Sequence, residues 1–418
     1  MRRKNRMKVL WFEVTVPQRY KGDGQVLGGW QDSLERVVRT CKEVELVVSF
    51  ETQNGMSEIK NIDGVKYISM AIQFSAAEKI KAKWDFEIYA RKLETAMKAV
   101  VEAEKPDIIH VFGTEWPFGR VAKFTNIPVV IHIMGSMVPY VNALYAPGFS
   151  FADILNAIPW WNFKKRFGRW CSEHRMYLWR KSEEQIWQNV KNYMGRTKWD
   201  YALSNVLHPG RKYFHVEEAL RYDFLTTVKK WNGIDSSKIR LFSTGCSNFW
   251  KGPDMLLKTA RILTQMGVDF EWNVAGQMNA EVKKCVEKKL KTTFAENNVN
   301  LLGFVQPDKL SDLLCNSSMY VHTAYIENSP NSICEAECMG VPVVSTNVGG
   351  IESLVRNGVD GDLVPANDPW QMANAIIELA KDKNRAVLYS KNAMEFARRR
   401  HADENILEQL LACYRDLV

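Results

Sequence analysis

The chain alternates short runs of β-branched and aromatic residues with longer stretches in which apolar residues recur at helical spacing. This alternation is typical of a parallel sheet whose strands are connected by crossover helices. The predicted strands of the first half are Val9–Val16, Val44–Phe50, Val65–Met70, Ile108–Phe112 and Val129–Met134. Their apolar runs are nearly continuous, which indicates strands covered by helices on both faces.

The second half of the chain repeats this pattern. Its predicted strands are Ile239–Ser243, Phe270–Ala275, Asn300–Phe304, Met319–Thr323 and Val341–Ser345. A chain of 418 residues exceeds one ordinary hydrophobic core, so we expect two α/β domains. The segment WNGID indicates a boundary near residue 235, which gives an N-terminal domain at 1–234 and a second domain at 235–385. We expect the amphipathic C-terminal helix, 386–418, to pack back on the first domain.

The composition favours a cytoplasmic location. No apolar stretch approaches the roughly eighteen residues of a membrane span, and Glu13 interrupts the short apolar run that follows the basic N-terminus. The 8 cysteines lack paired spacing, and we interpret Cys334 and Cys338, one helical turn apart, as helix packing rather than a zinc site. The net charge of +8 does not distinguish nucleic acid, anionic lipid or an anionic substrate as the partner.

The most informative stretch is ENSPNSICE, residues 327–335. Pro330 and Asn331 suit the start of a helix, whose free amides and dipole favour an anion such as a diphosphate. Glu327 would precede this helix, and Glu335 would lie about one turn into it. Because carboxylates accept hydrogen bonds from paired hydroxyls, the two glutamates suit a ligand with a sugar at one end and a ribose at the other.

The run from Glu327 to Val364 resembles the signature of family 4 glycosyltransferases: two glutamates with seven residues between them, a small-residue turn with proline, a strand and a double glycine. The resemblance implies the GT-B fold, an α/β architecture of two Rossmann-like domains whose parallel sheets face each other across a cleft. In that family the first glutamate contacts the donor sugar and the second contacts the nucleotide ribose; here these are Glu327 and Glu335. The other donor-binding residues predicted at the helix start are Asn331, Ser332 and Ile333.

Lys251-Gly252 resembles the phosphate-binding lysine of the same family. An ammonium group there would neutralise the charge that grows on a departing diphosphate. The family usually has an arginine five residues earlier, where this chain has Cys246, and Arg196 is a candidate substitute. We also predict that Arg196 and Asp200 hold the acceptor or the domain hinge, with an interior ion pair as the alternative.

Gly28 and Gly29 follow the first predicted strand, and adjacent glycines let backbone amides approach phosphate oxygens. Family members carry glycines at this place, so we predict that both bind the donor; a plain turn is the alternative. Many members also place a histidine near the donor sugar where this chain has Met134. His132, two residues earlier on the same strand face, is therefore a predicted catalytic residue, with a buried core histidine as the alternative.

The resemblance implies transfer from a nucleotide-diphosphate sugar with retention of anomeric configuration and with neither metal nor cofactor. No Asp-x-Asp lies between a predicted strand and a turn, as a metal-dependent transferase would require. Our hypothesis is that the leaving diphosphate itself accepts the acceptor's proton. The predicted catalytic set is Lys251, Glu327 and His132, and the setting that the resemblance implies is bacterial cell-surface polysaccharide biosynthesis.

Trp160–Asn192 differs from the rest because it interleaves aromatic residues with lysines and arginines. Such mixing suits a helix at the surface of an anionic membrane, and a lipid-linked saccharide acceptor at the inner face of the cell membrane would explain it. The alternative is a set of ordinary helices whose cationic side chains lie over apolar surface.

Other classes of protein explain fewer of these motifs. An epimerase or phosphorylase of the same fold is the nearest alternative, and a non-catalytic two-domain sugar-binding protein would not need Lys251 with Glu327 and Glu335. A dinucleotide-dependent oxidoreductase would show GxGxxG after the first strand, which is absent from the sequence. Nucleic-acid binding would account for the charge alone, since no recognised module is present.

Overall fold

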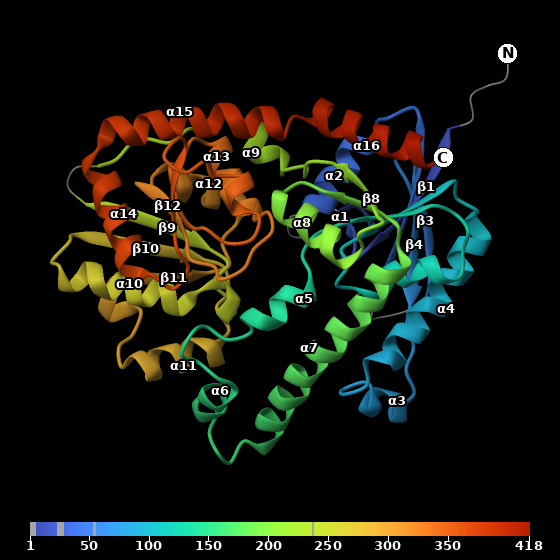
Figure 1. Ribbon diagram of the computed structural model, residues 1–418, viewed down its shortest axis with the longest axis horizontal. Helices are drawn as coiled ribbons and strands as arrows, with labels where there is room; N and C mark the ends of the chain where they lie inside the picture. Colours follow the sequence, from blue (N-terminus) through green and yellow to red (C-terminus); the bar gives the residue numbers. More distant parts are fainter. Residues whose placement is uncertain (1–5, 23–28, 53–55, 236–237) are drawn as a thin grey trace. The chain divides into compact units, whose positions relative to one another are not determined.

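The structure is a computed structural model that describes residues 6–22, 29–52, 56–235 and 238–418 (Figure 1). The chain forms two compact units. Unit 1 comprises Met1–Val141, Trp170–Arg221 and His401–Val418, and unit 2 comprises Asn142–Arg169 and Tyr222–Arg400. Each unit is built around its own sheet.

In unit 1 the described residues form an eight-stranded sheet, parallel except for its first strand, which pairs antiparallel with the second. In order across the sheet the strands are β3 (Ile59–Ile62), β4 (Val65–Ala71), β2 (Val44–Thr52), β1 (Met7–Glu13), β5 (Ile108–Phe112), β6 (Val129–His132), β7 (Asn192–Gly195) and β8 (Lys212–His215). The register places Val9 beside Leu46 on one side and Ile108 on the other.

Alternate residues of β1 enter two different cores, because successive side chains of a strand point to opposite faces. Val9 and Trp11 pack with α2 (Trp30–Val38) and α16 (Asp403–Leu417). Leu10 and Phe12 pack with α4 (Phe86–Glu104) and the end of α7 (Phe163–Asn189). The remaining helices of this unit are α1 (Gln18–Lys21), α3 (Ala76–Lys81), η1 (Pro117–Lys123), α5 (Met137–Tyr140) and α8 (Lys198–Leu207).

In unit 2 the described strands form a six-stranded, fully parallel sheet. Its order is β11 (Val299–Gly303), β10 (Phe270–Ala275), β9 (Ile239–Thr244), β12 (Met319–His322), β13 (Val343–Thr346) and β14 (Gly361–Val364). Its helices are α6 (Phe151–Ala157), α9 (Tyr222–Thr226), α10 (Pro253–Gln265), α11 (Ala280–Leu290), α12 (Pro307–Cys315), α13 (Asn331–Cys338), α14 (Pro369–Lys381) and α15 (Lys383–Arg400). Cys334 and Cys338 are fully buried along α13, as helix packing requires.

The division into units differs from the sequence-based boundary at residue 235. The segment that begins at Tyr222 already packs in unit 2, because α9 contacts α13. Trp231 then fixes the following chain there, since its backbone N–H donates to Met339 O at 3.0 Å and its indole Nε1 donates to Ser317 O at 2.8 Å.

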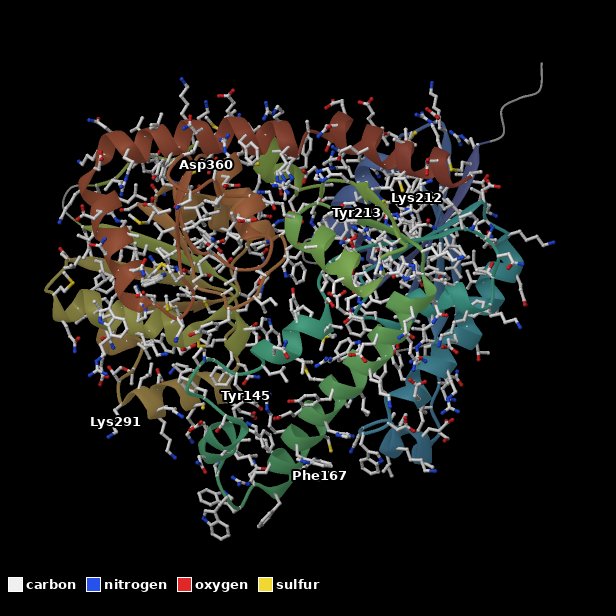
Figure 2. All side chains as sticks on the ribbon, viewed as in Figure 1. Tyr145, Phe167, Lys212, Tyr213, Lys291 and Asp360 are labelled. Carbon is white, nitrogen blue, oxygen red and sulfur yellow. The ribbon has the colours of Figure 1, made fainter. Side chains whose placement is uncertain are left out.

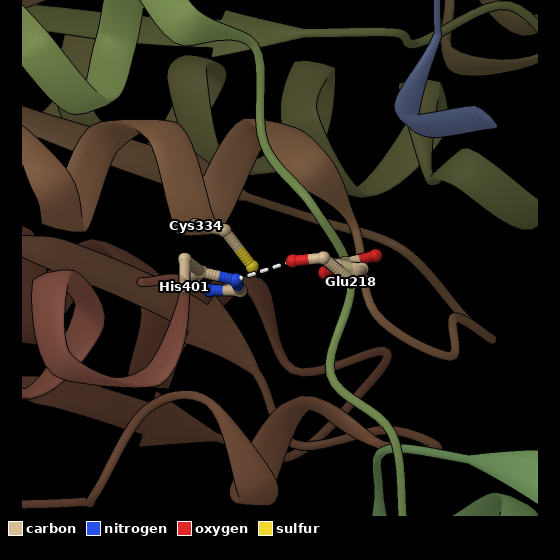
Figure 3. Close-up of side chains that lie close together, drawn as sticks. All are labelled: Glu218, Cys334 and His401. Atoms are coloured by element: carbon tan, nitrogen blue, oxygen red, sulfur yellow. Dashed lines mark hydrogen bonds between the residues drawn. The ribbon is translucent and has the colours of Figure 1, made fainter. Parts of the chain in front are cut away.

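The predicted C-terminal helix, 386–418, is two helices rather than one, so that prediction is corrected. The chain leaves α15 after Arg400, and Ala402 adopts φ −64° and ψ 130°, which interrupts the helical backbone. Asp403 and Glu404 then occupy the first turn of α16, where carboxylates favour a new helix start. Between the helices, His401 Nδ1 lies 2.9 Å from the Glu218 carbonyl oxygen (Figure 3). α15 belongs to unit 2, whereas α16 belongs to unit 1.

Candidate functional site

The candidate site of unit 2 lies at the carboxyl ends of β9, β12 and β13, where the connecting loops leave a parallel sheet. This edge is where α/β sheets generally bind ligands. β9 continues into Cys246 and the short helix η3 (Phe249–Lys251), and β12 continues into Thr323 and then Glu327. The edge therefore gathers most of the residues that the sequence singled out.

Lys251 and Glu327 form an ion pair. Lys251 Nζ lies 2.8 Å from Glu327 Oε1 and 2.6 Å from Oε2, and the lysine side chain keeps 27% of its surface exposed. The two predicted residues are 76 positions apart in the sequence, and the fold brings them together. Paired carboxylate and ammonium groups at this edge offer both an acceptor for hydroxyls and a donor for phosphate oxygens.

Two glycines fix the backbone around this pair. Gly252 has φ +69°, and a Cβ added there would lie 1.8 Å from Thr323 O. Gly349 has φ +54°, and its Cβ would lie 1.8 Å from Glu327 O. The next residue, Gly350, donates its N–H to that same Glu327 oxygen at 3.0 Å. The double glycine of the sequence signature thus lies directly against the backbone of Glu327.

Helix α13 begins at Asn331, as predicted, with Pro330 as its N-cap. Pro330 provides no side-chain cap, and Ser332 Oγ accepts from Tyr320 Oη at 2.8 Å. Ile333 is fully buried, and its N–H donates to Pro330 O at 3.0 Å. Glu335 is also buried, on the next turn of the helix.

Cys246 and His322 are neutral groups beside Lys251. Burial raises the pKa of the Cys246 thiol to about 12, against the opposing effects of Thr323 and the Lys251 charge. Burial lowers the pKa of His322, which ends β12, to about 4, while the Glu327 charge opposes that shift. Cys246 therefore carries no positive charge where the family has an arginine. Sequence reasoning missed His322, although a histidine at a strand end was a usable signal.

The predicted residues of unit 1 lie in a separate group. His132 ends β6, is fully buried, and packs edge-on against Trp30 at 4.8 Å between ring centroids. Burial, followed by the charge of Arg196, lowers its pKa well below the usual range. Within the described residues neither ring nitrogen has a hydrogen-bond partner. These features fit the alternative, in which His132 is a buried core histidine. The structure does not test a catalytic role for His132, which stays a prediction.

Arg196 and Asp200 are both buried in unit 1, and their predicted role in holding the acceptor or the hinge, like the alternative of an interior ion pair, stays a prediction. Arg196 Nη1 donates to Ile133 O at 2.8 Å, and its Nε lies 3.1 Å from Glu218 Oε2. Asp200 accepts from the Arg196 backbone N–H at 2.9 Å and belongs to the capping box of α8. Because Arg196 lies in unit 1, its role as a substitute for the arginine missing at Cys246 stays a prediction.

Of the predicted glycine pair, Gly28 lies outside the described residues. Gly29 is the N-cap of α2, and a Cβ added there would meet no atom of the described residues within 4 Å. Its contact with the donor stays a prediction.

Two coupled carboxyl groups at the carboxyl ends of β5 and β6 were not found from the sequence. Glu183 on α7 accepts from Thr114 Oγ1, from Ser136 Oγ at 3.0 Å and from Val138 N–H at 3.0 Å. Burial, then the charge of Glu115, raises the pKa of Glu183 to about 8, and burial raises the pKa of Glu115 to about 6. The pair therefore holds at least one proton at neutral pH. It was missed because 68 residues separate the glutamates and only the tertiary fold joins them.

This pair predicts a pH dependence of stability. Glu183 binds its proton more tightly in the folded chain than in the unfolded chain, so its contribution to stability falls as pH rises from about 4.5 to about 8. In Glu183→Gln that loss should disappear, and the melting temperature should depend less steeply on pH between 5.5 and 8. The matched control is Glu184→Gln, a half-buried neighbour on α7 that pairs with Arg180. Parallel melting profiles for wild type and Glu183→Gln would contradict the protonated pair.

Residues 226–396 match the family model described as glycosyl transferases group 1. This part of the chain therefore resembles members of that family. The match includes Lys251, Cys246, Glu327, Glu335 and the double glycine, which are the residues gathered at the edge of the unit 2 sheet.

Curated glycosyltransferases also show similarity to part of this chain. The D-inositol 3-phosphate glycosyltransferase of Corynebacterium urealyticum is 28% identical over 172 residues, which are 40% of each chain. The amylovoran biosynthesis glycosyltransferase AmsK of Erwinia amylovora is 28% identical over 153 residues, 34% of this chain and 36% of that protein. The matches thus span less than half of the length of these relatives.

The fold extends the likeness to the whole chain. The solved structure of Anabaena HepE in complex with UDP-glucose aligns with a TM-score of 0.65, covering 98% of this chain and 100% of that chain at 15% identity. At this identity the comparison shows the fold alone, which is the GT-B type with two parallel-sheet α/β units. The sequence-based prediction of that fold is confirmed.

Proposed function

We propose that the protein is a retaining glycosyltransferase that moves a sugar from a nucleotide-diphosphate donor to a saccharide or lipid-linked saccharide, without a metal ion. The observation that carries the proposal is the Lys251–Glu327 ion pair ahead of α13, within the region that resembles group 1 glycosyl transferases. The structure of HepE, which shares the fold, was solved in complex with UDP-glucose. AmsK acts in amylovoran biosynthesis, which supports a setting in polysaccharide assembly.

In this proposal the ion pair opens when the donor binds. Lys251 turns to the diphosphate and Glu327 accepts hydrogen bonds from sugar hydroxyls, so each charge exchanges one partner for another. The start of α13 faces the diphosphate with its free amides, and Glu335 accepts from the ribose. As the glycosidic bond breaks, Lys251 stabilises the charge on the leaving oxygen. That diphosphate then takes the proton of the attacking hydroxyl on the same face, which gives retention.

Cys246 contributes no positive charge to the proposed diphosphate site. The thiol is neutral because burial holds its pKa at about 12, so Lys251 is the cation that the loop between β9 and α10 brings to the diphosphate. This makes the reaction depend on one ammonium group more strongly than it would if a guanidinium stood beside it.

The test uses water as the first acceptor, so that the natural acceptor need not be known. The protein is incubated with a panel of nucleotide sugars in EDTA, and proton NMR follows the released sugar before mutarotation. We expect hydrolysis of one donor, with the released sugar first appearing in the donor's own anomeric configuration. Appearance of the opposite anomer would contradict retention, and activity that returns only with a divalent ion would contradict metal independence. Conversion of the donor to an isomeric nucleotide sugar would favour the epimerase alternative.

A further inference from the structure

The turn between α6 and α7 exposes four large aromatic side chains close together in the sequence. Trp160, Trp161, Phe163 and Phe167 keep 71%, 65%, 69% and 53% of their surface exposed. In Figure 2, Phe167 lies near this end of α7. Elsewhere the large aromatic residues Trp11, Trp187 and Trp272 are fully buried. Exposure of contiguous aromatic surface on this scale marks an interaction site.

The turn is held rigidly within unit 2. Arg166 Nη1 donates to Leu155 O at 2.6 Å and to Ile158 O at 3.3 Å, which closes the end of α6. Lys165 Nζ pairs with Glu281 at 3.0 Å, and Lys289 Nζ pairs with Asp153 at 2.8 Å, which joins the turn and α6 to α11. These contacts attach the turn to α6 and α11. Moving the aromatic side chains to a buried position would break them.

The turn itself carries charge of one sign, although Glu281 of α11 and Asp153 of α6 pair with nearby lysines. From Pro159 to Trp170 the sequence holds cations at Lys164, Lys165, Arg166 and Arg169 and no acidic residue. The neighbouring α11 adds Lys284 and Lys288. Aromatic rings flanked by lysines suit a membrane interface, where the rings enter the headgroup level and the cations meet anionic phosphates.

The structure leaves only part of Trp160–Asn192, the segment that the sequence predicted for membrane contact, on the surface. Trp160–Asn192 does not act as one surface, because Ile186 and Trp187 near the end of α7 are buried in the core of unit 1. For that part of α7 the alternative interpretation, an ordinary helix covering the sheet, is confirmed. The turn and the earlier part of α7, which still exposes Tyr177, remain available.

We propose that the aromatic turn, Trp160–Phe167, docks the protein on the surface of an anionic lipid bilayer. The aromatic side chains insert to headgroup depth, and Lys164 with the lysines of α11 faces the lipid phosphates. Within the described residues no helix combines the length and apolar character of a membrane span, so the contact is interfacial. This inference goes beyond the proposed function, because lipid binding needs no donor and no turnover.

The test is flotation of the full chain with vesicles of phosphatidylcholine alone or with a third phosphatidylglycerol, at low and high salt. We expect binding to the anionic vesicles that weakens with salt. Trp160→Ala with Trp161→Ala should reduce the binding constant by about tenfold or more. The matched control is Trp370→Ala, because Trp370 on α14 is 70% exposed in the same unit but lies outside the turn. It should bind as wild type does.

Several outcomes would overturn the inference. Absence of flotation with anionic vesicles at low salt would do so, as would equal binding by the double variant and wild type. A wild-type chain that is dimeric by light scattering, and monomeric only in the double variant, would show that a second copy covers the turn instead. A separate control checks that the double variant folds: its donor turnover in detergent-free buffer should equal that of wild type.

Discussion

Lys251→Ala should lower turnover by about 100- to 1000-fold at saturating donor, the size of effect seen when one group that stabilises a developing negative charge is removed. In the proposed mechanism Lys251 is the cation that the loop between β9 and α10 brings to the diphosphate, since the buried Cys246 is a neutral thiol. The fold should persist, but the melting temperature should fall, because the variant leaves the buried Glu327 carboxylate without its Lys251 partner. The measurement is the rate of nucleoside diphosphate release together with the melting temperature.

The control for this variant is Lys283→Ala. Lys283 also pairs with a glutamate, Glu287, at 2.8 Å in the same unit, but it lies on α11 and outside the site. It should keep wild-type turnover. Lys251→Arg should recover part of the rate, because it restores the charge with a different shape. Near-normal turnover of Lys251→Ala would remove the lysine from the mechanism.

Gly349→Ala should lower turnover because the added methyl group displaces the backbone of Glu327. The added Cβ would lie 1.8 Å from Glu327 O, and an alanine at φ +54° adds roughly 1–2 kcal/mol of strain. Glu327 must move, so we expect turnover to fall by at least about tenfold, as a shift of 1 Å in a positioning group costs on the order of 100-fold. The melting temperature should fall by about 5 °C.

Gly358→Ala separates the clash from the strain. Gly358 has φ +76°, but a Cβ added there would meet no atom within 4 Å. This variant should lose only the part of the stability that the strain accounts for, less than Gly349→Ala loses, and should keep its turnover. If Gly349→Ala and Gly358→Ala were equally active, the contact between the double glycine and Glu327 would not matter for catalysis.

The long strands could be predicted from the sequence because their apolar runs are continuous. β1, β2, β5, β9 and β10 all overlap the predicted segments. The short strands β7 and β8 were missed, since Asn192–Gly195 ends in glycine and Lys212–His215 is polar at both ends. Their strand conformation comes from pairing with β6 and with each other, which a local pattern does not contain.

The site residues also fall into two groups, those that the sequence could predict and those that it could not. Lys251 and Glu327 could be predicted because each belongs to a motif with its own local chemistry, and the fold then joined them. The Glu115–Glu183 pair could not, because its unusual pKa values arise from burial and from a neighbour on another element. His132 stays a prediction: its aromatic surroundings fit the alternative of a core histidine, and a sequence pattern alone does not separate the two.

The central claim is that this chain cleaves a nucleotide-diphosphate sugar at the edge of the unit 2 sheet. It is tested most directly by release of nucleoside diphosphate from a panel of nucleotide sugars in EDTA, with wild type and Lys251→Ala side by side. We predict that wild type releases the diphosphate from one donor and that Lys251→Ala releases it about 100-fold more slowly or less. Release at the same rate by both proteins, or by neither with any donor of the panel, would contradict the claim.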